Sequence, residues 1–478
     1  MNIFKKKSLC AALAGIGVLG VAGAAQAVNL NPDGLGQVLI YPYYTVRSDA
    51  AGNAYNSLLS VVNTTASVKA VKVRFLEGKN SREVLDFNLY LSPKDVWAAA
   101  ISATADGAAL TSPDKSCTLP LAVSQGQTIA FRNGAYAGID GGGSTLDRTR
   151  EGYAEIIEMS TYADNSTTHT NVTHVSGVPP GCSKQTDALG DSEALPPTGG
   201  LIGGITLINV NAGTDFTADA VAIDNFSVAK LYTGAGKDTP NLESASPPIS
   251  VVVANNQVFQ SAWTPSTGEA VSAVLMHDQI MNEYVLDAVT KSGTDWVVTM
   301  PTKRFFVGIG TGAPDELFQS NFSKNDSTGS CDDVSPTIYD REENTTSTPL
   351  DFSPQPTAGV NSLCFEANVI TFQSASVLGS VNTETITPPA SFEHGWLNLG
   401  FLPSTVSGAT HKLINFGGTQ VAALGAAFGA PATATYVGLP VVGFAVQSFV
   451  NGAISVNGVN TLSNYGGNFV QKGTRLIE

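Results

Sequence analysis

The sequence predicts an all-β protein made of two antiparallel, immunoglobulin-like β-sandwich modules with long loops rich in Gly, Pro and Asn. Three observations predict this fold class. The 478 residues include 48 glycines and 24 prolines, and only 14% of them are charged. Apolar residues come in short bursts that often alternate with polar residues, as in half-buried strands. Beyond residue 27, no segment keeps the helical period over four turns.

The first module is expected over residues 28–160. In residues 69–77, apolar side chains alternate with Lys72 and Arg74, which places the two cations on the opposite, solvent-facing side of a strand. Residues 84–91 alternate in the same way, and the turn sequence EGKNS between the two segments predicts a hairpin. Further short strands complete a pattern typical of an immunoglobulin-like sandwich. They are expected at residues 38–46, 58–63, 128–132 and 153–159.

Residues 161–248 are interpreted as a loop-rich insertion or linker with extra strands, because polar runs and Pro-Pro-Gly or Pro-Pro-Thr breakers interrupt the apolar segments. Residues 249–478 form the expected second sandwich. Its strands are expected at residues 249–254, 271–277, 296–300, 303–309, 365–374, 395–402, 437–450 and 469–476. The apolar run 437–450 requires a covering surface. The following stretch, residues 451–468, has no charge and no proline to protect a sheet edge, so it is the expected contact for assembly.

The first 27 residues have the pattern of a cleaved signal peptide. Three lysines at positions 5–7 precede an apolar run, and Ala25-Gln26-Ala27 places the cleavage before Val28. A membrane anchor is the alternative, but the run is rich in Gly and Ala and closes on a cleavage motif. We therefore expect an exported protein that is periplasmic, on the cell surface or extracellular, without membrane insertion.

Charge excludes some partners. The signal segment carries three lysines and no acidic residue, so the remaining chain holds 22 basic and 40 acidic residues, a net charge of −18. Nucleic acids and anionic membranes attract proteins through clustered cations, which this chain lacks after Lys7. Neither is an expected partner.

Four cysteines remain after cleavage: Cys117, Cys182, Cys331 and Cys364. An even number in an exported protein predicts disulfides, and three connectivities are possible. Pairing Cys117 with Cys182 and Cys331 with Cys364 is preferred because each bond then stays within one half of the chain. A metal site is the competing interpretation, but no C-x-x-C spacing occurs.

Catalytic motifs are scarce. The sequence has no G-x-S-x-G, H-E-x-x-H or P-loop. Two carboxylate pairs, Glu155 with Glu158 and Asp278 with Glu283, have the residue types of a glycosidase, but 40 acidic residues make such pairs common. His169 and His174 lie in a polar loop, where solvated histidines are a simpler interpretation than metal ligands. The sequence therefore favours a protein without catalysis and requires no cofactor.

Two weaker binding sites are considered. An acidic stretch containing Asp326, Asp332, Asp333 and Asp340 offers the oxygen ligands that Ca²⁺ prefers, although EF-hand spacing is absent and a solvated acidic loop is the alternative. Aromatic residues could stack on sugars, above all Tyr43 and Tyr44 beside Pro42. The four tryptophans, including Trp396, are also aromatic candidates, but most lie among apolar residues and are expected in the core.

Several segments resemble a group of secreted or cell-surface bacterial proteins without an assigned activity. They are LIYPYYTV at residues 39–46, VKVRFLEG at residues 71–78, residues 85–97, and TDWVVTMPTKRF at residues 294–305. The resemblance implies a secreted or surface-associated protein and transfers no site residue.

Together these features predict an exported structural, adhesive or matrix-type protein of the cell surface. Its expected partners are further copies of itself, other surface proteins or a polysaccharide. The alternative is a secreted protein that binds or processes carbohydrate; an exposed aromatic row in a groove would favour binding, and convergent carboxylates in a cleft would favour hydrolysis.

Overall fold

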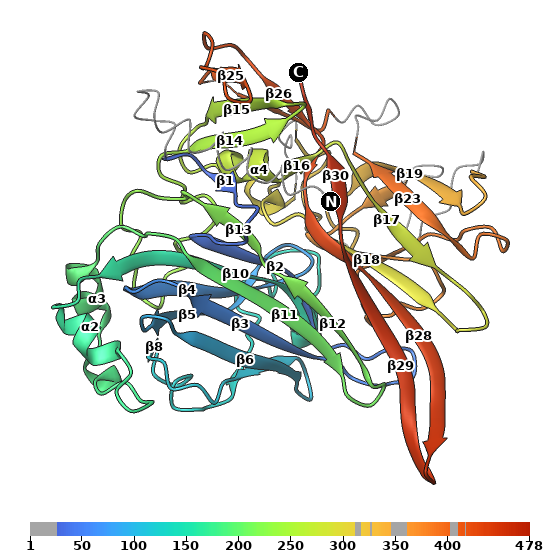
Figure 1. Cartoon of the computed structure of the whole chain (residues 1–478), viewed down its shortest axis with the longest axis horizontal. Coiled ribbons are helices and arrows are strands. Elements are labelled where there is room, and N and C mark those ends of the chain that lie inside the picture. Colours follow the sequence, from blue (N-terminus) through green and yellow to red (C-terminus); the bar gives the residue numbers. More distant parts are fainter. Residues whose placement is uncertain (1–25, 311–316, 326, 346–360, 402–409, 416) are drawn as a thin grey trace.

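The computed structural model describes residues 26–310, 317–325, 327–345, 361–401, 410–415 and 417–478, and it is all-β with several antiparallel sheets (Figure 1). The all-β prediction is confirmed. Among the named strands only β21 and β22 pair in parallel.

Two large sheets share a core in the first half of the chain. The seven-stranded sheet has the order β1-β13-β2-β10-β4-β5-β8, and the six-stranded sheet has the order β12-β11-β3-β6-β7-β9. Both sheets are larger than those of an immunoglobulin domain, so the immunoglobulin-like topology is not confirmed. The strands are β1 (Asn29–Leu30), β13 (Val221–Asp224), β2 (Val38–Thr45), β10 (Glu151–Tyr162), β4 (Val68–Glu77), β5 (Glu83–Leu91), β8 (Thr118–Leu119), β12 (Thr214–Asp219), β11 (Leu201–Asn209), β3 (Asn56–Asn63), β6 (Val96–Ala103), β7 (Ala108–Thr111) and β9 (Ile129–Ala130).

The predicted hairpin is present as β4 and β5, with Val73 opposite Phe87 and Val71 opposite Leu89. These apolar side chains face the six-stranded sheet, as their alternation predicts. The expected solvent exposure of Lys72 and Arg74 is wrong, because both are buried. Lys72 pairs with Asp86 and Arg74 with Glu155. Other parts of the chain cover the sheet face that carries Lys72 and Arg74, and acidic side chains pair with both cations.

The second half covers part of the outer face of the seven-stranded sheet, and Val172 together with Tyr232 covers another part. One core cluster contains Val38 and Ile40 of β2 and Tyr153 of β10 together with Trp296 and Leu397 from the second half. The seven-stranded sheet is therefore a middle layer with a core on each side. Strands of a middle layer are covered on both faces, which explains the complete burial of β2, β4 and β10.

The module boundary expected at residue 160 does not separate two units. β11 of the expected insertion pairs with β3, and β13 pairs with β2, so both complete the first pair of sheets. Val28 forms a bridge with Ser250, which ties the start of the described chain to the second half. Pairings between strands distant in sequence determine the domain structure, and local composition does not reveal them.

Two five-stranded sheets form the main core of the second half, with the orders β22-β21-β18-β28-β29 and β20-β19-β23-β17-β30. Their facing side chains include Trp296 and Phe372 from one sheet and Ile280, Ile338 and Leu397 from the other. The strands are β22 (Thr383–Thr385), β21 (Ala367–Thr371), β18 (Gly293–Thr299), β28 (Val442–Val456), β29 (Val459–Val470), β20 (Asn361–Leu363), β19 (Asp332–Asp340), β23 (His394–Gly400), β17 (Gln279–Val285) and β30 (Lys472–Thr474).

Small sheets and short helices complete the fold. The strands expected at 271–277 and 303–309 are wrong over most of their length: α4 (Glu269–Leu275) occupies most of the first, and the second begins with a 3-10 turn, η4 (Lys303–Phe305), and continues without a strand through residue 308. The α4 side chains after Glu269 are all buried, so no polar face revealed a helical period in the sequence. The other elements are β14 (Ile249–Ala254), β15 (Gln257–Ala262), β25 (Thr419–Ala423), β16 (Met276–His277), β27 (Leu439–Pro440), β24 (Lys412–Ile414), β26 (Thr435–Val437), β31 (Leu476–Ile477), η2 (Leu146–Arg150), α2 (Thr167–Val172), η3 (Cys182–Lys184) and α3 (Asp187–Glu193).

Candidate functional site

The predicted sugar-stacking pair is in the core. Tyr43 and Tyr44 are fully buried. The Tyr43 hydroxyl donates to Glu151, and the Tyr44 ring packs edge-on against Phe75. The register between β2 and β10 shifts at this point, and both tyrosines belong to a core cluster that also includes Val297 and Phe444 of the second half. Neither tyrosine can reach a ligand, so the sugar-binding prediction for them is wrong.

The acidic stretch does not gather its carboxylates. Asp332 and Asp340 lie at opposite ends of β19, roughly 26 Å apart for nine extended residues. Asp333 accepts from Gln319, and Asp340 accepts from Asn344. Asp326 lies outside the described residues. No group of three potential metal ligands occurs in the described part of the chain, so Asp332 and Asp340 cannot serve one Ca²⁺ ion together.

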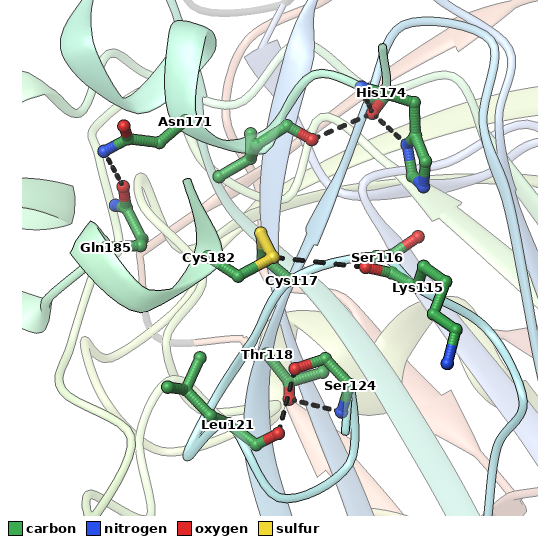
Figure 2. Close-up of a disulfide and its surroundings, with 12 residues drawn as sticks. Lys115, Ser116, Cys117, Thr118, Leu121, Ser124, Asn171, His174, Cys182 and Gln185 are labelled. Carbon is green, nitrogen blue, oxygen red and sulfur yellow. Dashed lines mark hydrogen bonds between the residues drawn. A yellow bond between two sulfur atoms is a disulfide. The ribbon is translucent and has the colours of Figure 1, made fainter. Parts of the chain in front are cut away.

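Both preferred disulfides are present: Cys117 bonds Cys182, and Cys331 bonds Cys364. Figure 2 shows the first, which joins η3, beginning at Cys182, to the segment just before β8. Cys117 is buried in a small cluster with Tyr90 and Tyr162. This disulfide therefore fixes the helical excursion of α2 and α3 to the edge of the seven-stranded sheet. Two disulfides fit an oxidising compartment.

The first nominated pair of carboxylates, Glu155 with Glu158, has structural partners. Glu155 and Glu158 are buried and form ion pairs with Arg74 and Lys69. Glu158 also accepts from the backbone N–H groups of Thr198 and Gly199. Burial raises the pKa of Glu158, while the Lys69 ammonium and these hydrogen bonds oppose the rise. Because both carboxylates are closed to solvent, they are suited to holding neighbouring segments together and not to hydrolysing a substrate.

The two loop histidines also have local partners. His174 forms a 2.7 Å hydrogen bond with Ser92 through Nδ1. The backbone N–H of His169 donates to the Ser166 hydroxyl, which caps α2. Both contacts hold the segment around α2 in place. Neither histidine joins a metal-ligand group within the described residues.

A second buried ionic cluster joins η4 to β19. The Lys303 ammonium lies 2.6 Å from Asp332, and His411 Nε2 lies 3.8 Å from the same carboxylate. All three side chains are almost completely buried. Burial alone would raise the pKa of Asp332, but Lys303 and His411 together lower it below its ordinary value. The cluster has catalytic residue types without access, so it acts as a structural anchor.

Several exposed apolar side chains lie on the hairpin formed by β28 and β29, here named the hairpin arm. Figure 1 shows the arm, in red, extending beyond the two halves. Its base is anchored, because Phe444 and Val446 are buried in the core and β28 pairs with β18. The expected covering surface for the run 437–450 is therefore found over much of that run. Farther out, the side chains of β29 emerge into solvent.

Strand β29 is an edge strand that pairs only with β28 among the described strands. Asn464 and Asn468 donate to carbonyls of β12 and its preceding turn, which fixes one face of β29 against the first half. The opposite face carries Val459, 66% exposed, and Tyr465, 58% exposed. The stretch 451–468 thus forms an edge, as the absence of charge and proline predicted.

A groove lies beside the base of the arm, next to β17, which pairs with β23 on one side and β30 on the other. Its volume is about 480 Å³, and Trp396 of β23, Glu283 of β17, Phe469 of β29 and Lys472 of β30 are among its lining residues. We name it the Trp396 groove. Trp396 is 40% exposed, whereas Trp97, Trp263 and Trp296 are buried, as expected for tryptophans among apolar strand residues. A sequence signal existed: Trp396 follows a glycine and precedes an alternating Leu-Asn-Leu segment.

In comparisons with known proteins, no family model, no curated sequence and no solved structure matches this chain. None of the helices in the described ranges is long and apolar enough to cross a bilayer. The candidate sites therefore rest on their own geometry: the hairpin arm as a contact surface and the Trp396 groove as a ligand site.

Proposed function

We propose that this chain is an exported structural or adhesive protein that assembles at the cell surface through its hairpin arm, without catalysis. The observation that carries the proposal is the edge of β29. Among the described strands β29 pairs only with β28, and a twelve-residue strand with exposed apolar side chains and an open outer edge is a template for strand addition. The partner is a second copy of the chain, aligned edge to edge with its own β29.

Three further features support export and surface assembly. The signal-like segment 1–27 directs secretion, with maturation before Val28. The two disulfides suit an oxidising compartment. The resemblance of segments such as 71–78 and 294–305 to secreted bacterial proteins agrees with this localisation, and an immunoglobulin-like origin of the sandwiches would fit an adhesive role.

The test is the oligomeric state of the mature chain from Val28 onward. Size-exclusion chromatography with light scattering should show a mass that rises from monomer toward dimer as concentration increases through the micromolar range. Replacing Val459 and Tyr465 by lysine should keep the chain monomeric, because charges on an edge strand oppose strand pairing. In the unmodified chain, assembly should slow hydrogen exchange of the β29 amides. In the double-lysine variant, the exchange should not change with concentration.

Val175→Lys is the matched control. Val175 is also highly exposed but lies in the loop that follows α2, so its substitution should leave assembly unchanged. A wild-type chain that stays monomeric at every concentration, or a double-lysine variant that assembles equally well, would refute the arm as the contact. Localisation is tested separately by fractionating cells and sequencing the mature N-terminus.

A further inference from the structure

Trp396 is held in a fixed orientation with one ring face covered. Its ring stacks on that of Tyr339, with centroids 4.5 Å apart and planes 12° apart. The two residues are direct cross-strand partners on β23 and β19, and Glu283 of β17 continues the same row. Cross-strand partners on one face lie side by side, so Tyr339, Trp396 and Glu283 form one row on the outer side of the sheet.

Free polar groups lie beside this row. Neither the Glu283 carboxylate nor the Lys472 ammonium forms a hydrogen bond or ion pair with another described side chain. Lys472 is opposite Met281, two residues from Glu283, so the two charged side chains are diagonal neighbours on the same outer face. The groove thus combines an immobilised aromatic face with an acceptor and a donor that have no internal partner.

A second aromatic residue flanks the groove on the far side of β17. Phe469 of β29 is 37% exposed. The backbone carbonyls of Phe469 and Val470 accept from the Asn282 amide, which joins this wall to β17. The volume of about 480 Å³ is within the range of small-molecule sites. Aromatic surfaces and unpaired polar groups therefore face one common space.

We propose that the Trp396 groove binds a pyranose unit of a polysaccharide. A pyranose has an apolar face of C–H groups, which packs on the negative face of an indole ring, and a rim of hydroxyls, which require both donors and acceptors. Trp396 provides the stacking surface, Glu283 accepts from hydroxyls and Lys472 donates to them. This inference does not depend on assembly through the hairpin arm.

The groove is better suited to a sugar than to a segment of a partner protein. A peptide strand would need an unpaired backbone edge, whereas the outer row of β17, β23 and β19 lies on the face of a sheet whose backbone groups are paired across the strands. The neighbouring free carboxylate would oppose burial under an apolar partner surface. A sugar hydroxyl satisfies that carboxylate while remaining partly in water.

The test measures binding of cellohexaose, chitohexaose, mannohexaose and hexagalacturonate to the mature chain by isothermal titration calorimetry. At least one should bind, and Trp396→Ala should weaken its binding by about tenfold or more, the effect of losing one well-made contact. Trp396→Phe should retain most of the affinity, because an aromatic face remains. Glu283→Gln should weaken binding less than Trp396→Ala.

A second readout locates the ligand. The bound hexasaccharide should protect tryptophan fluorescence from acrylamide, because Trp396 is the accessible indole and the other three are buried. The control variants are Val175→Ala and the double-lysine variant of the hairpin arm, both of which should bind sugar normally. The inference is overturned if none of the four hexasaccharides binds, if Trp396→Ala binds equally well, or if protein concentration alone protects the indole.

Discussion

Glu384 is a buried carboxylic acid with neither a cationic neighbour nor a hydrogen-bond donor among the described residues. It lies in β22, is 1% exposed, and neither carboxylate oxygen has a hydrogen-bond partner among the described residues. Burial raises the pKa of Glu384 to about 9. The native state therefore holds it protonated at neutral pH, whereas the unfolded chain ionises it near pH 4.

The direction of the pH effect follows from proton binding. Between roughly pH 4 and pH 9 the native state binds one more proton at Glu384 than the unfolded state, so this residue lowers the free energy of unfolding as pH rises. We predict that Glu384→Gln is close to wild type in stability at pH 5 and more stable by about 4 kcal/mol at pH 8. Urea unfolding at both pH values measures this difference.

Glu393→Gln is the control for Glu384→Gln, because Glu393 is exposed on the segment that leads into β23. Its effect should be the same at both pH values. If Glu384→Gln changed stability equally at pH 5 and pH 8, the carboxyl would be ionised in the native state, and an unseen partner would have to be sought.

Single residues also mark where the sequence interpretation failed. Lys72 and Arg74 alternate with apolar residues, and alternation alone cannot distinguish a face in water from a face that distant ionic partners cover. Glu155, the partner of Arg74, lies 81 residues away in sequence. The sugar-stacking prediction for Tyr43 and Tyr44 was wrong for the same reason, because the layers that cover their side chains come from other parts of the chain.

At the level of elements, the disulfide between Cys117 and Cys182 secures a region with little core of its own. The helices α2 and α3 have six and seven residues, which is short for independent helices in water. We predict that replacing both cysteines by serine lowers the free energy of unfolding by about 2–5 kcal/mol. Urea unfolding followed by tryptophan fluorescence measures the change.

Peptide mapping without reduction supplies the covalent check on that prediction. It should recover Cys117 joined to Cys182 and Cys331 joined to Cys364, as the structure has them. Proteolysis of the double-serine variant should begin between residues 163 and 200. An unchanged unfolding curve together with free thiols in the wild type would show that packing alone holds the excursion.

Element prediction succeeded where the pattern was local. The β4–β5 hairpin depends on a turn and two alternating segments within 24 residues, and all of these are visible in the sequence. The hairpin arm was predicted in part: its apolar base and uncharged edge are sequence properties. Its position against β12 depends on Asn464 and Asn468, whose partners lie about 250 residues away.

At the scale of the whole molecule, the two halves share a core. Val38 and Tyr153 from the first half and Trp296 and Leu397 from the second belong to one buried cluster. We predict a single cooperative transition in thermal unfolding, with equal calorimetric and van't Hoff enthalpies. A fragment ending at residue 248 should not reach a stable fold, because part of the outer face of its seven-stranded sheet would be exposed.

Two resolved calorimetric transitions, or a fragment 28–248 with sharp melting of its own, would contradict that prediction. Sequence reasoning expected the opposite, two modules with a linker, because composition changes near residues 161 and 248. These changes in composition mark surface loops and not domain boundaries. The strand pairings that cross them, such as β11 with β3, depend on complementary faces that no local pattern encodes.

The last twenty residues, 459–478, contribute edge strands to three different sheets: β29, β30 and β31. A chain delivered from its N-terminus cannot complete any of these sheets until this segment has arrived. Such distant closures also slow folding, since each one must overcome the entropy of a long loop. Completion of these three sheets is therefore a late step of folding, and β28, β17 and β26 each keep an open edge until residues 459–478 add to them.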